Sequence, residues 1–139
     1  MDTHIEYLPI SYLDALITNT QGMLDAGNDL LALLEKAKTK PHVLDDASVS
    51  RITDVYTEQQ QEIKYYQQLL QHWMQDNPTE QQQTTLVEFE SKINDALKMH
   101  RQIFFITDFL KQHTIDQILK REDAELAIDV LTDKIFPPA

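Results

Sequence analysis

The sequence contains no cysteine and only two glycines among its 139 residues. The missing thiols exclude thiol catalysis, iron–sulfur clusters and thiolate zinc sites, and they suit a reducing compartment, although exported bacterial proteins also lack cysteine in many cases. Two glycines cannot supply the usual glycine-rich phosphate loop or nucleophile elbow, and neither motif occurs. We therefore expect no nucleotide chemistry and no catalytic activity of a familiar kind.

Long apolar runs are also missing. The longest run of bulky apolar residues is only Ile103 to Ile106, and residues 1–6 lack the basic and apolar regions of a signal peptide. We therefore expect neither a signal peptide nor a membrane-spanning helix. The expected location is the cytoplasm, with export to another compartment or cell left open.

Positive charge is scarce, because 12 Lys and Arg face 23 Asp and Glu, for a formal net charge of −11. Such a surface repels the phosphate backbone of nucleic acids and anionic membranes. We therefore expect a protein partner with a basic or mixed basic and apolar surface, and neither nucleic acid nor membrane as a partner. The length fits one domain, 1–139, that needs no disulfide or structural metal.

What the sequence does contain is a helical pattern. Glycine is rare and glutamine is common, and apolar residues recur at a seven-residue spacing in three segments. The pattern predicts an all-α fold: an elongated antiparallel bundle of three long helices, with one or two short C-terminal helices packed on one end. The predicted helices span residues 10–39, 47–76, 78–113 and 115–135.

Several local features refine this expectation. Ser11 with Asp14 resembles a capping box, and Asn77 is expected to cap the third helix with Pro78 as its first residue. Gly27 lies on the apolar stripe of the first helix, where it permits close approach of a neighbour or, alternatively, a kink. The apolar direction of the C-terminal segment rotates around Arg121 to Asp123, which indicates a kink or break there.

The third segment becomes apolar on nearly every side beyond Met99, through Phe104, Phe105 and Phe109. A helix of this kind needs a cover. We expect the C-terminal segment to cover this end, so that Phe105 and Phe109 belong to the core. The alternative is that both rings line a groove for a partner helix.

Helical bundles can hold metal sites, but Glu-x-x-His, the motif of carboxylate-bridged metal pairs, does not occur. The nearest arrangements are His72 with Asp76 and His113 with Asp116, which offer two ligands each. His100 is the single histidine on an apolar stripe, where an interior hydrogen-bonded role is the usual one. We expect no cofactor, and a ligand-binding or metal-binding bundle remains the alternative.

Acidic residues cluster on the second helix and near the C-terminus. On the second helix three acids recur every four residues beside an aromatic and a leucine, an arrangement that fits an interface for a basic partner or, alternatively, a solvated face. The predicted partner-binding residues are Asp54, Glu58, Glu62, Tyr65, Leu69, Glu122 and Glu125.

Together these features indicate a small acidic protein-interaction module that acts as an adaptor, a secretion-type chaperone or an inhibitor. Self-association into a homodimeric bundle is a second interpretation, because the apolar faces of the first and third helices are wide. An acidic mimic of nucleic acid that blocks a basic cleft is a third.

Overall fold

The computed structural model describes residues 7–135, with the side chains of residues 7–128. A short 3₁₀ turn, Ile10–Tyr12, leads into α1, Leu13–Ala37, and a second turn, Pro41–Val43, precedes α2. The remaining helices are long and closely spaced in sequence: α2 is Asp46–Gln75, α3 is Glu80–Leu110 and α4 is Ile115–Ile135. The described part of the chain contains no strand, so the predicted all-α class is confirmed.

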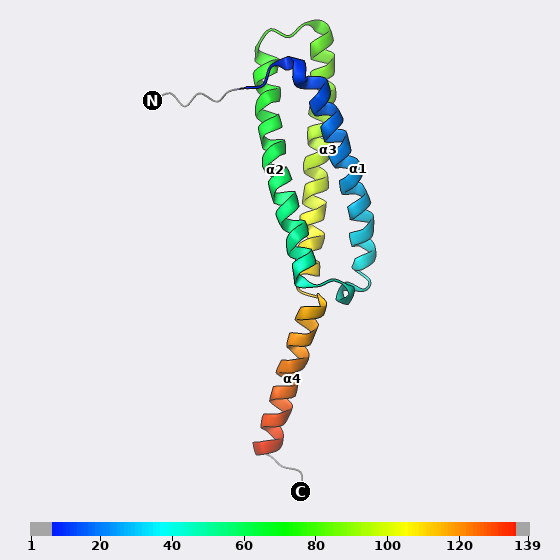
Figure 1. Ribbon diagram of the computed structural model, residues 1–139, viewed down its shortest axis with the longest axis vertical. Coiled ribbons are helices and arrows are strands. Elements are labelled where there is room, and N and C mark those ends of the chain that lie inside the picture. Colours follow the sequence, from blue (N-terminus) through cyan, green and yellow to red (C-terminus); the bar gives the residue numbers. More distant parts are fainter. Residues whose placement is uncertain (1–6, 136–139) are drawn as a thin grey trace, which may run out of the picture.

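Helices α1, α2 and α3 lie side by side, and each runs antiparallel to the next one in sequence (Figure 1). Helix α3 packs against both α1 and α2, which makes it the central element of the bundle. Helix α4 leaves the end of α3 and points away from the bundle (Figure 1). The predicted antiparallel bundle of three long helices is therefore confirmed.

The core forms where the seven-residue stripes of the three helices meet. In α3 the predicted stripe from Leu86 to Leu110 is buried along its whole length, and Phe89 contacts the rings of Tyr66 and Trp73 in α2. The periodicity therefore located the buried faces correctly. Within these three helices it did not include three residues that are also buried, which are Leu69, Met99 and Ile106.

Gly27 provides close contact between α1 and α3. It is buried in the middle of an unbroken helix, and the Met99 side chain of α3 occupies the space where a Cβ would stand. The predicted close approach is present, and the alternative kink is not. The second glycine, Gly22, has no atom within 4 Å of its Cβ position and is exposed.

The helix ends differ from the predictions in their details. Helix α1 begins after a 3₁₀ turn, and its N-cap Tyr12 makes no side-chain capping bond, so the expected Ser11 cap is wrong. Helix α3 begins with a capping box between Thr79 and Gln82. Asn77 instead adopts a positive φ of 47° in the turn before the helix, so it does not cap α3.

The largest difference concerns the C-terminal segment. It forms one continuous helix, α4, so the break expected around Arg121 to Asp123 is wrong. Its first turn contacts the start of α2, Arg121 donates a hydrogen bond to the Gln112 carbonyl, and the described side chains of α4 do not cover the end of α3. Phe105 is 75% exposed and Phe109 is 40% exposed, because α4 extends away from the rings that it was expected to bury.

Candidate functional site

The acidic row on α2 faces solvent. Asp54, Glu58 and Glu62 are all exposed, and Val55, which is 51% exposed, precedes Glu58 by three residues and Glu62 by seven. This spacing places the apolar side chain on the same helix face as the acids. Arg51 shares that face, yet the single ion pair among residues 7–128 joins Lys38 to Glu35 on α1. None of the three α2 acids therefore forms an ion pair with a cation in the part of the chain whose side chains are described.

The two apolar members of the predicted partner-binding set behave differently. Tyr65 is half-buried and packs against the core, with part of its ring accessible beside the acidic row. Leu69 is 0% exposed, so its inclusion in a binding surface is wrong. It points inward because the core face of α2 is wider than one seven-residue stripe.

Glu62 is held in place by α1. Its Oε1 accepts a hydrogen bond of 2.9 Å from the Tyr66 hydroxyl, which in turn accepts one of 2.6 Å from Asn19 Nδ2. Burial, together with the neighbouring carboxylate of Glu62, raises the pKa of Tyr66 to about 12. This network fixes the direction of the Glu62 carboxylate at one end of the acidic row.

Glu122 and Glu125 are exposed on α4, which projects beyond the bundle (Figure 1). The structure therefore does not join them to the α2 acids in one surface. The predicted site separates into an acidic row on α2, which is Asp54, Glu58, Glu62 and Tyr65, and an acidic stretch on α4.

Hydrogen bonds between the N-terminus of α2 and the N-terminus of α4 set the direction of α4. The Asp46 carboxylate at the start of α2 accepts hydrogen bonds from the Thr114 hydroxyl, at 2.6 Å, and from Gln117 Nε2, at 3.0 Å. In return, Asp116 of α4 accepts one of 2.7 Å from the backbone N–H of Asp46. The backbone N–H of Ile115 also donates to the Leu44 carbonyl at 2.9 Å.

The sequence gives no indication of this junction. Thr114 and Gln117 also form a local cap at the start of α4, because the Gln117 backbone N–H lies 3.3 Å from the Thr114 hydroxyl. Asp46 and Asp116 are first-turn acids, which are common because they suit the positive end of the helix dipole. Their pattern therefore gives no signal of a contact across 70 residues.

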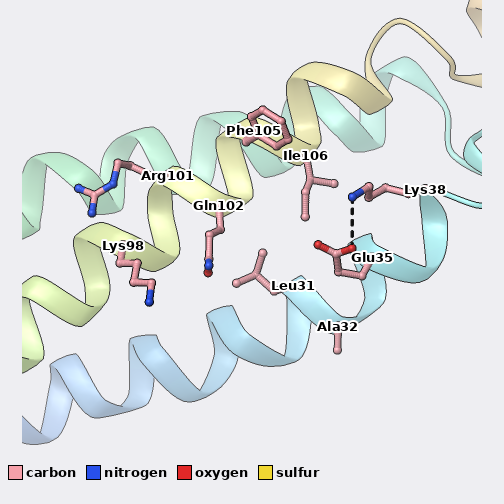
Figure 2. Close-up of a pocket in the computed structure, with 9 residues that line it drawn as sticks. All are labelled: Leu31, Ala32, Glu35, Lys38, Lys98, Arg101, Gln102, Phe105 and Ile106. Carbon is pink, nitrogen blue, oxygen red and sulfur yellow. Dashed lines mark hydrogen bonds and ion pairs between the residues drawn. The ribbon is translucent and has the colours of Figure 1, made fainter.

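A shallow groove of about 670 Å³ lies between α1 and α3 near the uncovered end of the bundle. Leu31 and Ile106 line its floor, and Lys98 and Gln102 reach across it toward α1 (Figure 2). Phe105 also lines this groove, from the α3 side (Figure 2). In a chain of strongly negative charge this groove is basic, since Lys38, Lys98 and Arg101 line it with Glu35 as the one acid.

His100 lies in the interior of the bundle at 0% exposure. Its Nε2 is 2.7 Å from the side-chain oxygen of Gln59, so Nε2 carries the proton and donates it. Its Nδ1 is buried without a hydrogen-bond partner. The predicted interior role is confirmed, and burial lowers the pKa of His100, so the ring is neutral in the folded protein near neutral pH.

This burial predicts a loss of stability on acidification. The unfolded chain takes up a proton at His100 as the pH falls below its ordinary pKa of 6.5, whereas the folded chain resists protonation to lower pH. Between about pH 7.5 and about pH 5.5 the free energy of unfolding should fall by about 1 kcal/mol more in the wild type than in His100→Gln. Urea unfolding at both pH values measures the difference.

The control is His42→Gln, which changes an exposed histidine in a turn. It should keep the full pH dependence of the wild type. If His100→Gln retains that dependence as well, the buried ring is not its source.

The histidine pairs considered for metal binding do not assemble into a site. His72 stacks on Tyr7 at 4.1 Å, and His113 stacks on Phe109 and donates from Nδ1 to that residue's carbonyl at 2.9 Å. Across residues 7–128 no group of three or more His, Asp or Glu side chains lies close enough to hold a metal ion.

No helix in the described ranges combines the length and the apolar character that crossing a membrane requires. Comparisons with protein-family models, with curated proteins and with solved structures found no match to this chain.

Proposed function

We propose that this chain is an acidic helical interaction module, of the adaptor, secretion-type chaperone or inhibitor kind, that binds a protein partner in the cytoplasm. The observation that carries the proposal is the acidic row on α2, where Asp54, Glu58 and Glu62 are exposed and form no ion pair with a described cation, beside the exposed Val55. Unpaired like charges at this spacing cost the free helix a few tenths of a kcal/mol per pair. A partner of opposite charge offsets that cost.

The chemistry of the row also indicates the kind of partner. Carboxylates arranged along one helix face attract Lys and Arg side chains over long range and accelerate association. Val55 and the accessible part of Tyr65 supply apolar contact area between and beside the charges. A helix or loop with alternating basic and apolar residues matches this surface.

The proposal is tested by affinity capture from a lysate of the source organism at low salt, with elution by increasing salt. The variant Asp54→Lys/Glu58→Lys reverses the row. Its matched control is Glu88→Lys/Glu90→Lys, which makes the same change in net charge at exposed positions of α3. We expect the wild type and the control to retain one stoichiometric protein that moderate salt releases, and the row variant to lose it.

Equal retention of that protein by the row variant would contradict the proposed surface. Circular dichroism of each variant confirms that the bundle is intact. The substituted side chains are exposed, so the effect on folding should stay within about 0.5 kcal/mol.

A further inference from the structure

We propose that the basic groove between α1 and α3 binds an acidic, amphipathic helix of a protein partner. This goes beyond the proposed function, because the groove is lined by α1 and α3 alone, whereas the acidic row belongs to α2. The two surfaces also attract opposite charges, so they serve different partners.

The groove extends along a considerable length of the two helices. A second hollow of about 330 Å³ adjoins the first one, and Lys98 and Gln102 line both. On α3 the lining residues run from Lys92 to Ile106, which is about 21 Å at a rise of about 1.5 Å per residue. This length corresponds to about four turns of a helix lying against α1 and α3.

The lining residues form one face of each helix. They recur at spacings of three and four residues, from Gln21 to Lys38 on α1 and from Lys92 to Ile106 on α3. The close contact of Gly27 with Met99 holds α1 against α3 along this line. The groove is therefore a straight feature between two packed helices, which is the shape that a further helix fits.

The charge of the groove is opposite to the charge of the whole chain. Four of the 12 basic side chains line it and only two of the 23 acids do, which are Lys38, Lys92, Lys98 and Arg101, and Glu35 and Asp95. Lys38 pairs with Glu35, and Lys92 donates to Gln21 Oε1 at 2.5 Å. Lys98 and Arg101 form no ion pair among residues 7–128, so both are available to the carboxylates of a partner.

The groove also offers apolar contact at one end. Leu31 and Ile106 form its floor there, and Phe105, at 75% exposure, lines it from the α3 side (Figure 2). A partner helix that carries apolar residues on one face and acids beside them matches both features. The groove is shallow, whereas sites for small ligands enclose most of the ligand surface, so a helix is the better occupant.

The net charge of the chain makes the match selective. At a net charge of −11 the surface as a whole repels an acidic segment. A local excess of cations is therefore the place to which such a segment is directed. Nonspecific attraction to the protein cannot mimic this binding, because it acts in the opposite direction.

The test uses a synthetic helix of about 15 residues, stapled to hold its conformation, with leucines on one face and glutamates on both sides of them. Fluorescence anisotropy measures its binding to the full chain. We expect a dissociation constant of about 100 µM or lower at low salt, and weaker binding as salt rises. A peptide of the same composition with its leucines spread around the helix should bind at least about tenfold more weakly.

The variant Lys98→Glu/Arg101→Glu should raise the dissociation constant of the acidic helix at least about tenfold, because it places like charges opposite the glutamates. Its matched control is Lys64→Glu/Lys120→Glu, which makes the same change in net charge at exposed positions of α2 and α4. The control should bind nearly as tightly as the wild type. All four side chains are exposed, and circular dichroism checks that each variant folds.

An acidic helix that fails to bind the wild type overturns the proposal, and so does an equal loss of binding in the control variant. Two other results assign the groove to a different occupant and overturn it as well. One is binding of dodecanoate, a small anionic amphiphile, without binding of the helix. The other is a wild-type dimer in light scattering that Lys98→Glu/Arg101→Glu dissociates.

Discussion

Asp46→Ala is expected to release α4 from the bundle and to lower the local stability of the junction by about 2–4 kcal/mol. The substitution removes the carboxylate that accepts from Thr114 and Gln117, and hydrogen bonds to a charged acceptor contribute about 1.5–3 kcal/mol each. It also leaves the fully buried Thr114 hydroxyl without its acceptor. Amide hydrogen exchange in the first turns of α4 should accelerate by about 30-fold or more, while the α3 core stays protected.

The matched control for this prediction is Asp45→Ala. Asp45 caps α2 by accepting a hydrogen bond from the Ser48 backbone N–H, and it makes no bond to α4. Its loss should cost about 1 kcal/mol at the start of α2 and leave exchange in α4 near the wild-type rate. Equal acceleration in both variants would show that general fraying of α2, and not the Asp46 carboxylate, governs the junction.

The same substitution at the two glycines is expected to have opposite effects. Gly27→Leu should lower the free energy of unfolding by about 1–3 kcal/mol, because the new side chain needs the space that Met99 fills between α1 and α3. Gly22→Leu should raise it by about 0.5–1 kcal/mol, since the site is open and leucine is the better helix former. Chemical denaturation of the two variants measures both values.

This pair isolates packing from helix propensity, because both variants gain the same intrinsic preference for helix. If the Gly27→Leu variant is as stable as the Gly22→Leu variant, this result would contradict the close contact between α1 and α3. A further check is Met99→Ala in the Gly27→Leu background, which should recover part of the lost stability by clearing the space.

The sequence predicted the bundle well because its signals are local. A seven-residue apolar spacing defines one face of a helix wherever that helix packs, so the buried stripe from Leu86 to Leu110 followed directly from the pattern. Gly27 was informative for the same reason, since its place on the stripe indicated close approach. The three long helices and their antiparallel order needed nothing beyond such information.

The path of the C-terminal segment did not follow from the sequence. The apolar residues of α4 indicated that the helix has something to cover, and Phe105 and Phe109 indicated a surface in need of cover, so joining the two within one chain was the natural hypothesis. The direction of α4 depends on the contact between Asp46 and Thr114, and no local pattern encodes that contact.

The predicted binding residues show the same difference between what local spacing predicts and what packing decides. Periodicity placed Asp54, Glu58 and Glu62 on one exposed face correctly, because helix geometry alone decides which residues share a face. The burial of Leu69 depends on how wide a face of α2 the other two helices cover, and that is a property of the packed bundle. Whether the acidic row binds a partner remains a prediction.

The most direct test of the proposed function is the association rate of the captured partner, measured over a series of salt concentrations. For the wild type and Glu88→Lys/Glu90→Lys, the rate should be high at low salt and fall steeply as salt screens the acidic row. For Asp54→Lys/Glu58→Lys it should be at least about tenfold lower at low salt and nearly independent of salt. An unchanged rate in that variant would contradict the account.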